Sequence, residues 1–496
     1  MKKIIYLFVW MTICVSCGDF LSEYPKDLLY ANTIEDVDEL LVGEGYMSTQ
    51  DPMNVDGVAA IQTWIHVMDD DIESIMHDGN DELPYPLFTE WRKNPFFTQR
   101  GATMDDRMWS RLYTHIGALN VIINKLEDFK TEKEYNRIKG EALFLRAAYY
   151  FWLVNVYGQP YQEEAAKQEP GVPLKLTDYV EIKSYSRDPV ADVYAVILED
   201  LQHAAACLRG VTQPTVYRVN AAAVHAFASR VYLYMGDYEN TIKQCDSVLL
   251  GYNYRLLDLN QHTNNKSMIF SGSPETIFSQ GENRFLMLSD KYVNSYVVSE
   301  NLRNTFKDQT NDLRFKFFQY FTHWKSRKTG YLIRKFYTNS DGVVSDCFLI
   351  RLAEVYLNKA EALAMTGKTK DAIDLIQTLR ENRYATGTLP DLNDEGDALV
   401  EFVRNERRLE LCFEGHRWFD IRRYAVSKVP MTKEIRHPHW ESNTVTSSYE
   451  IDRYYVLKPY SEDRSNYVMS IPQKELMLNE GTMVNNERVD SEYIKM

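Results

Sequence analysis

The chain has 496 residues, of which 45% are hydrophobic and 26% are charged, a balance typical of a soluble globular protein with one large or two ordinary domains. The formal net charge of −15 argues against a nucleic acid as partner, because binding to phosphates needs a basic surface. The cysteines after the N-terminal region lack the paired spacing of a metal site or a disulfide framework, so we expect buried, inert thiols at Cys207, Cys245, Cys347 and Cys412.

The first 30 residues predict export and attachment to a membrane. A charged start and an apolar run over residues 4–13, too short to span a bilayer, are typical of a secretory signal peptide over residues 1–16. Cys17 then stands where a lipoprotein precursor is cut and acylated. Several acyl chains on this residue would anchor the protein stably, with residues 17–30 as lipidated N-terminus and tether.

Residues 61–103 form the first of two predicted insertions. We expect a short helix over residues 61–70 and then a loop rich in acids, aromatics and prolines, and a long structured loop usually carries function. Some of its side chains could bind calcium, but the glycine that an EF-hand needs at its sixth position is absent. We therefore predict no metal and a solvated acidic loop at Asp78, Asn80, Asp81 and Glu82.

Helical periodicity dominates about residues 104–250 and 347–424 and predicts a helical scaffold. One of the predicted helices carries Arg146 within an apolar stripe. A charge on such a face needs a buried partner of opposite sign, and we expect Arg146 to pair with Glu406 or Glu410.

Two helix pairs within this scaffold share one plan. Residues 221–249 and 353–380 each contain a helix rich in small residues, a turn with Gly236 or Gly367, and a second amphipathic helix. This is the helix–turn–helix arrangement of tetratricopeptide repeats, although long inserts between the pairs rule out a continuous solenoid.

The second insertion, about residues 251–346, lacks helical periodicity. Short β-like runs at 276–279 and 330–337 predict a strand or two, and we expect the tail over residues 425–496 to be rich in loops. The predicted fold class is mainly α: a tetratricopeptide-repeat-like helical scaffold with a large irregular insert subdomain containing a few short strands.

The stretch over residues 398–424 predicts a helix with charges inside its apolar face, ended by Gly415 as a left-handed cap. Paired carboxylates act as acid and base in glycosidases, but a general acid needs a raised pKa, whereas arginines hold a carboxylate ionised. Since arginines surround the glutamates here, we favour a structural ion-pair network, with Arg146, Glu406, Glu410 and Arg417 as members.

Five motifs spread along the whole chain match one family. They are C-G-D-F-L from Cys17, W-x-x-L-Y-x-x-I-x-x-x-N from Trp109, R-L-A-E-V-Y-L-N-K-A-E-A from Arg351, R-x-E-R-x-x-E-L-x-x-E-G-x-R-x-x-D-x-x-R from Arg404, and I-P-x-x-E-x-x-x-N from Ile471. With these motifs the chain resembles the SusD/RagB family, the outer-membrane nutrient-binding lipoproteins of Bacteroidetes-type bacteria.

The resemblance implies that residues 31–496 form a single SusD-like unit, lipid-anchored to the outer membrane and exposed at the cell surface. It implies that the protein captures a nutrient polymer, usually a glycan, and delivers it to a SusC-type TonB-dependent transporter. The family is non-enzymatic, and the sequence contains no G-x-S-x-G, H-E-x-x-H, P-loop or Rossmann fingerprint. We predict neither an enzymatic activity nor a cofactor.

Glycan binding needs exposed aromatic faces on loops that a rigid scaffold holds. The two insertions meet this condition, and the alternative is that their rings only pack the insertions internally. As ligand-binding residues we nominate Tyr85, Trp91, Tyr292, Tyr296 and Trp324.

Three other functions stay open. A RagB-type lipoprotein would bind peptides, and a surface module that mainly binds a protein partner would bind no glycan. A secreted all-α glycoside hydrolase would use carboxylates such as Asp70 or Glu414 and would release new reducing ends.

Overall fold

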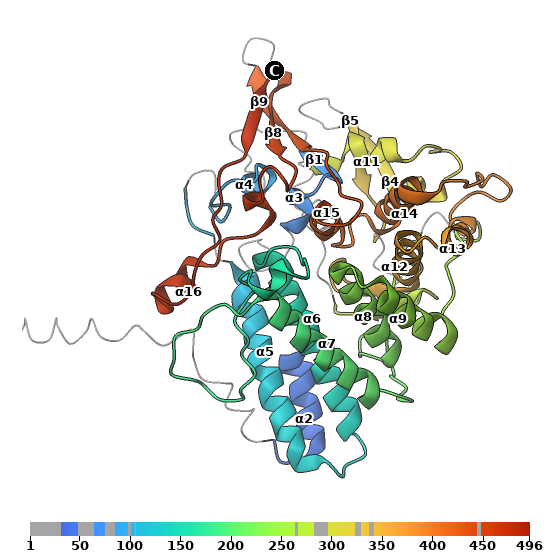
Figure 1. Cartoon of the computed structure of the whole chain (residues 1–496). Helices are drawn as coiled ribbons and strands as arrows, with labels where there is room; N and C mark the ends of the chain where they lie inside the picture. The colour runs from blue at the N-terminus through green and yellow to red at the C-terminus, as the bar shows by residue number, and fades with distance from the viewer. Residues whose placement is uncertain are drawn as a thin grey trace, which may run out of the picture.

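The computed structural model shows a mainly helical protein, with the long helices in the lower part of Figure 1 and small sheets at the top. The fold class predicted from the sequence, mainly α with a few short strands, is confirmed. Among the described residues, no helix is both long and apolar enough to cross a membrane. The structure describes residues 31–47, 64–74, 85–97, 101–104, 106–262, 266–281, 296–322, 329–336, 342–443 and 448–496.

Long helices build the scaffold. Helix α6 is buried along nearly its whole length, because α5 and α7 pack against it. Helix α12 packs against α8, α9, α13 and α14, which joins the two parts of the scaffold. The bounds are α2 Ile34–Leu40, α5 Arg107–Lys125, α6 Tyr135–Tyr157, α7 Val190–Cys207, α8 Ala221–Met235, α9 Tyr238–Gly251, α12 Leu352–Met365, α13 Thr369–Glu381, α14 Gly396–Leu411 and α15 Arg417–Ala425.

The two predicted helix–turn–helix pairs are present as α8–α9 and α12–α13. Gly236 and Gly367 lie at their turns with φ values of 75° and 74°, a left-handed conformation that glycine adopts without strain. Because α12 packs directly on α9, the two pairs adjoin in space although the second insertion separates them in sequence.

Small antiparallel sheets tie the insertions together. β1 of the first insertion pairs with β3 of the second, β2 pairs with β6 at the edge of the scaffold, and β4 and β5 form a hairpin. The tail contains a three-stranded sheet, β7-β8-β9. The bounds are β1 Ile72–Ser74, β2 Thr276–Ser279, β3 Tyr296–Val298, β4 Phe318–Thr322, β5 Thr329–Ile333, β6 Leu349–Arg351, β7 Ile435–Asn443, β8 Ser448–Leu457 and β9 Glu492–Lys495.

Short helices occur in the insertions, the loops and the tail. Ser299 caps α11 by accepting a hydrogen bond from the Leu302 amide, which fixes the chain direction after β3. The bounds are η2 Leu41–Gly45, α3 Ile65–Met68, α4 Pro86–Thr89, η3 Leu126–Phe129, η4 Ala165–Lys167, α11 Glu300–Thr305, η5 Leu313–Phe317, η6 Ser465–Tyr467 and α16 Gln473–Leu478.

The tail is more ordered than the sequence indicated. Residues 425–496 were expected to be rich in loops, but the hairpin of β7 and β8 is among the longest strand pairs, and β9 adds the end of the chain to it. Strand β7 lacks an alternation of hydrophobic and polar residues and contains Pro438, so neither signal predicts a strand there. Strand β9 is recognisable only from its pairing with β8.

Two helix boundaries also differ from expectation. In the first insertion, the described part of the expected helix over residues 61–70 is only the single turn of α3. Helix α14 ends at Leu411, before Gly415, which lies in the following turn with φ 74°. A Cβ at Gly415 would come within 3.2 Å of the Cys347 backbone, so close packing, in addition to the backbone angle, requires glycine here.

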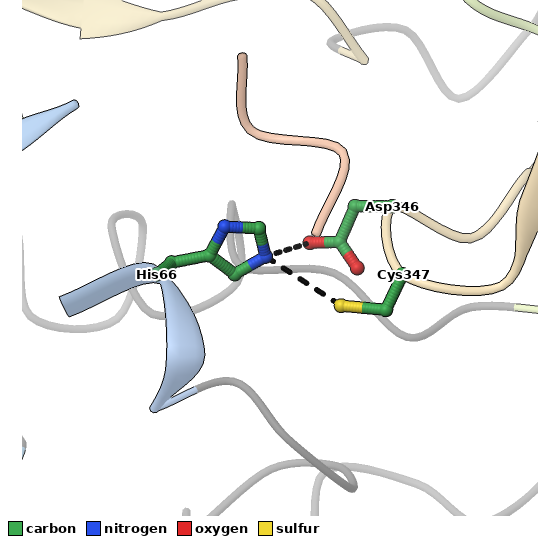
Figure 2. Close-up of side chains that lie close together, drawn as sticks. All are labelled: His66, Asp346 and Cys347. Carbon is green, nitrogen blue, oxygen red and sulfur yellow. Dashed lines mark hydrogen bonds and ion pairs between the residues drawn. The ribbon is translucent and has the colours of Figure 1, made fainter. Parts of the chain in front are cut away.

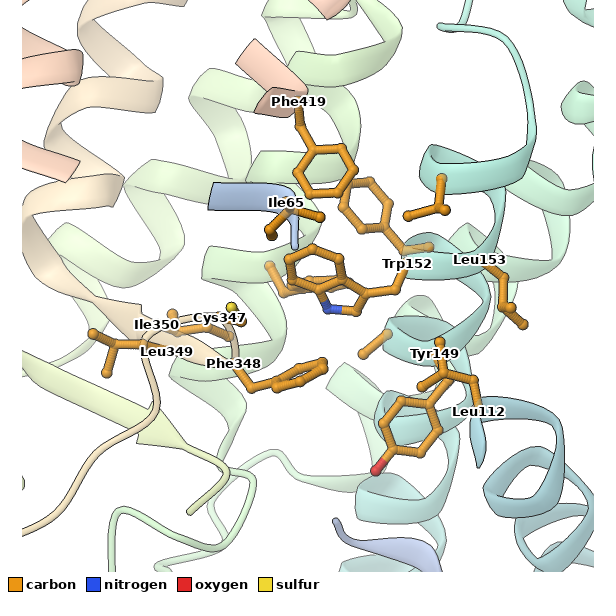
Figure 3. Close-up of a cluster of buried hydrophobic side chains, with 14 of the residues drawn as sticks. Ile65, Leu112, Tyr149, Trp152, Leu153, Cys347, Phe348, Leu349, Ile350 and Phe419 are labelled. Carbon is orange, nitrogen blue, oxygen red and sulfur yellow. The ribbon is translucent and has the colours of Figure 1, made fainter. Parts of the chain in front are cut away.

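Trp152 of α6 stands at the centre of the core that holds the scaffold to the insertions (Figure 3). Its ring lies 5.3 Å from that of Phe348, just before β6, and 5.1 Å from that of Phe419 in α15. One side chain thus joins three segments that are remote in sequence.

Candidate functional site

A polar cleft of about 230 Å³ lies where both insertions meet the tail. Its walls come from β1 and the residues before it, from the connection between β3 and α11, and from β7 with the residue before it. Convergence of remote segments on one concave site is the usual setting for a bound ligand. The lining residues are Asp70, Ile72, Glu73, Ser299, Asn301, Glu434, Ile435, Arg436 and His437.

Hydrogen bonds fix the positions of these walls. The Ser299 hydroxyl donates to the Asp70 carbonyl at 2.7 Å, next to the pairing of β1 with β3. On the opposite wall the two imidazole nitrogens of His437 each lie 2.8 Å from a carbonyl oxygen, those of Thr89 and Asp69. The first insertion is therefore attached to both other walls.

The floor of the cleft is a carboxylate held by two arginines. Asp70 lies 2.6 Å from Arg417 and 3.2 Å from Arg408, and Arg408 also pairs with Asp71 at 2.6 Å. Burial would raise the pKa of Asp70, but the guanidinium groups of Arg408 and Arg417 outweigh it and lower that pKa well below its usual range. An ionised Asp70 is unsuited to the role of general acid.

Glu414, the second carboxylate considered for hydrolysis, is buried and does not line the cleft. Its oxygens pair with Arg351, at 2.7 Å, and with Lys335. Asp70 is thus held ionised and Glu414 lies away from the cleft, so neither is suited to protonate a glycosidic oxygen.

The open walls of the cleft carry hydrogen-bonding groups of both charges. Burial raises the pKa of Glu73, which faces the start of α11. Glu434 and Arg436 are more exposed and pair with each other, and Asn301 adds an amide. Such groups can both donate hydrogen bonds to a ligand and accept them.

Trp91, nominated as a ligand-binding residue, is fully buried. Its indole N–H donates to the Met68 carbonyl at 3.1 Å, and its ring stacks on His437 with 4.1 Å between centroids. The expectation that this ring is exposed is wrong. It supports the His437 wall of the cleft from behind.

Tyr85 and Tyr296 are buried as well. The Tyr296 hydroxyl lies 3.1 Å from that of Thr89, and this contact packs the second insertion against the first. The expected exposure is wrong for these two rings as well: Tyr85 packs edge-on against Phe88 of its own insertion, and Tyr296 packs against the first insertion. Other residues named from the sequence lie outside the described part of the chain: Cys17, Asp78, Asn80, Asp81, Glu82, Tyr292 and Trp324.

The β4–β5 hairpin carries an aromatic pair, one exposed ring and one partly buried, that was not nominated from the sequence. Tyr320 is 59% exposed and lies opposite Tyr331 in the hairpin register, with ring centroids 5.5 Å apart. Arg303 of α11 lies 5.4 Å from the Tyr331 ring, and the same helix contributes Asn301 to the cleft. The β-prone run at residues 318–322, ahead of the strand predicted at 330, was the signal that could have revealed the hairpin.

Glu406 and Glu410 lie in a buried ion-pair network between the scaffold and the second insertion. Glu410 is 2.7 Å from Arg351, 2.9 Å from Arg383 and 3.4 Å from Arg314, and Glu406 is 3.1 Å from Arg314. Burial would raise the pKa of Glu410, but Arg383 and Arg351 outweigh it and hold that pKa well below its usual range. At Glu406 burial prevails and raises the pKa.

Arg146 and Arg417 do not belong to this network: Arg417 pairs with Asp70, and the expected pairing of Arg146 with Glu406 or Glu410 is wrong. The Arg146 guanidinium pairs with Asp200 of α7 at 2.7 Å and donates to the Asn120 side chain at 3.0 Å. The stripe that carries Arg146 faces the neighbouring helices α5 and α7, which the sequence pattern alone could not reveal.

Solved structures share this architecture of a helical scaffold with insertions. A putative sugar binding protein from Bacteroides vulgatus superposes with a TM-score of 0.69 at 22% identity, covering 92% of this chain and 98% of its own. A SusD superfamily protein from Bacteroides thetaiotaomicron gives a TM-score of 0.68 at 22% identity, covering 93% and 99%. These similarities define the structural class.

Sequence comparison identifies the family. A model described as "SusD family" matches residues 227–488, and one described as "Starch-binding associating with outer membrane" matches residues 48–233. SusD-like protein P38 of Formosa agariphila is 27% identical over 406 residues, which cover 69% of this chain and 76% of that protein. The chain belongs to the SusD family.

Proposed function

We propose that this protein is a cell-surface lipoprotein that binds an oligosaccharide or polysaccharide and delivers it to a SusC-type TonB-dependent transporter of the outer membrane. Membership in the SusD family supports this proposal, as do the sugar-binding description of the similar structure and the outer-membrane description of the second family model. The protein would act by binding alone, without a cofactor.

One observation carries the proposed site: the polar cleft and the tyrosine pair of the hairpin, of which Tyr320 is exposed, adjoin the same helix, α11. Sugar hydroxyls would bond to the carboxylate, amide and guanidinium groups of the cleft, and the apolar face of a sugar ring would stack on Tyr320. A polymer could contact both at once.

Calorimetric titration of the full-length protein in mild detergent with a panel of glycans tests this site. Tyr320→Ala should weaken binding by roughly 1–3 kcal/mol, by analogy with bases stacked on aromatic side chains. Tyr179→Ala is the matched control, because Tyr179 is 60% exposed but belongs neither to the cleft nor to the hairpin. Equal affinities in the two variants would contradict the site.

A peptide ligand is the second candidate, and the carboxylates of Glu73 and Glu434 on the cleft walls favour it. A cationic peptide would bind more weakly as salt is added, whereas a neutral glycan would show little salt dependence. If the panel contains no glycan that binds while a basic peptide binds with a steep salt dependence, the glycan proposal fails. Release of new reducing ends would instead support a hydrolase.

The proposed location depends on Cys17. Cys17→Ala should remove the acyl anchor, so the variant should leave the membrane fraction and no longer partition into detergent. Wild-type behaviour of this variant would contradict the lipoprotein assignment. Co-purification of a TonB-dependent transporter with the wild-type protein from outer membranes would test the proposed partner.

A further inference from the structure

Three side chains with metal-binding chemistry meet between α3 and the segment before β6. His66 belongs to α3 of the first insertion, and Asp346 and Cys347 immediately precede β6. Figure 2 shows one imidazole nitrogen of His66 facing both partners: Nε2 lies 3.4 Å from Asp346 Oδ2 and 3.5 Å from Cys347 Sγ. All three donor atoms lie within 4.8 Å of one another.

The two separations from His66 Nε2 match the edges of a zinc tetrahedron. Zinc bonds of about 2.1 Å to nitrogen and oxygen and about 2.3 Å to sulfur place nitrogen and oxygen about 3.4 Å apart, and nitrogen and sulfur about 3.6 Å apart. A direct N–H···O hydrogen bond is typically about 2.9–3.0 Å long, shorter than the contact between His66 and Asp346. In addition, a single N–H cannot point well at both Oδ2 and Sγ.

The burial and the charges of the three side chains also fit a metal site. Exposed fractions are 1% for His66, 1% for Asp346 and 2% for Cys347. A divalent ion would balance one thiolate and one carboxylate, with the imidazole neutral, so the buried site would carry no net charge. Nitrogen, oxygen and sulfur donors together suit zinc better than calcium or magnesium.

Three side chains leave one position of a zinc tetrahedron for a further ligand. Three protein ligands and one water complete the tetrahedral coordination that zinc adopts in many proteins.

We propose that His66, Asp346 and Cys347 bind one transition-metal ion, with zinc as the best fit, and that this ion fastens the first insertion to the scaffold. His66 stands four residues before Asp70, the floor of the cleft, so the metal would also hold the cleft in shape. The sequence contains no spacing signal for this site, because His66 and Cys347 are 281 residues apart.

Metal analysis of the tag-free, full-length protein tests the proposal. After treatment with a chelator and dialysis against zinc or cobalt, the wild-type protein should retain one metal ion per chain and melt at a higher temperature than the metal-free form. The cobalt form should show a thiolate-to-metal charge-transfer band. X-ray absorption of the zinc form should show a single sulfur at about 2.3 Å among nitrogen and oxygen ligands.

Variants identify the ligands. Cys347→Ser and His66→Gln should lose the bound ion and the cobalt band, whereas Cys245→Ser, at another fully buried thiol, should keep both. Wild-type protein that retains no ion would overturn the proposal. So would a sulfur-free shell, or full metal retention in folded Cys347→Ser. If the ligand variants fail to fold, the wild-type stoichiometry and absorption spectrum alone decide the matter.

Discussion

Two groups of acidic side chains in this protein have the same chemistry and opposite surroundings. In the interior network, Glu410 is enclosed by arginines from β6, η5 and the end of α13, with no exposed surface. In the cleft, Asp70 pairs with Arg408 and Arg417 and also lines the open volume, as Glu73 does. A carboxylate that protein groups enclose on all sides can only stabilise the fold, whereas one that also borders an open cleft can bind a ligand.

Glu410→Ala tests the interior side of this comparison and should have the largest effect. Removing the carboxylate leaves buried guanidinium groups unpaired, so the free energy of unfolding should fall by about 3–5 kcal/mol. Denaturant unfolding measures the change. Glu401→Ala on the exposed face of the same helix is the control and should stay within about 0.5 kcal/mol of the wild type; equal losses in the two variants would refute the structural role of Glu410.

Trp91→Ala tests whether Trp91, which the sequence suggested as a ligand-binding residue, instead stabilises the fold as Glu410 does. Because the indole is buried behind His437, its loss should lower the free energy of unfolding by about 3–5 kcal/mol. Thermal melting of this variant should differ clearly from that of Tyr320→Ala, whose ring is exposed. A Trp91→Ala protein that is as stable as the wild type but no longer binds the ligand would show that Trp91 is a ligand-binding residue.

Glu475 of α16 is a buried carboxylate in a third kind of environment: its hydrogen-bond donor is neutral, whereas arginines surround Glu410 and Asp70. It accepts a hydrogen bond from the Trp109 side chain, and burial raises its pKa to about 7. The folded protein therefore holds this proton more tightly than the unfolded chain. The stability that Glu475 contributes is fully present below about pH 4.5 and is lost as the pH rises through about 7.

Glu475→Gln keeps a neutral side chain at every pH and should remove this loss. Between pH 5 and pH 8 the wild type should lose about 1–3 kcal/mol more stability than the variant, because a tenfold difference in proton affinity between the folded and unfolded chain corresponds to about 1.4 kcal/mol. Melting temperatures measured across that range show the difference. Parallel pH profiles of the two proteins would mean that Glu475 is already ionised when folded, as Glu410 is.

Residues whose roles follow from local pattern were recognised from the sequence. The small-residue helices around Gly236 and Gly367 follow from periodicity. The need for cations beside Glu406 and Glu410 follows from the cost of an unpaired buried charge, but the arginines that meet this need are Arg314, Arg351 and Arg383 from other elements, not those of the same stretch. Strand β2 was also located correctly, since its β-prone run is short and clearly bounded. The helices and this strand depend on neighbours within a few turns of the chain.

Other assignments needed the packed structure. Two buried acids of the hallmark stretch were plausible partners for Arg146, but the docking of α6 on α7 brings Asp200 to it instead. Trp91 and Tyr296 lie in irregular insertions where no periodicity separates inside from outside. The tail strand β7 covers Trp91 through His437, and Tyr296 packs against Thr89 of the first insertion.

The sequence by itself determined the helical scaffold, its turns, the family of the protein and the need to neutralise the acids in α14. These features rest on short-range backbone preferences and on residue chemistry. Only the tertiary structure decided how remote segments meet: the cleft between β1, α11 and β7, the tyrosines of the β4–β5 hairpin, and the cluster of His66 with Asp346 and Cys347. Contacts between remote segments depend on how whole elements pack through many weak interactions, and a local sequence pattern does not predict that packing.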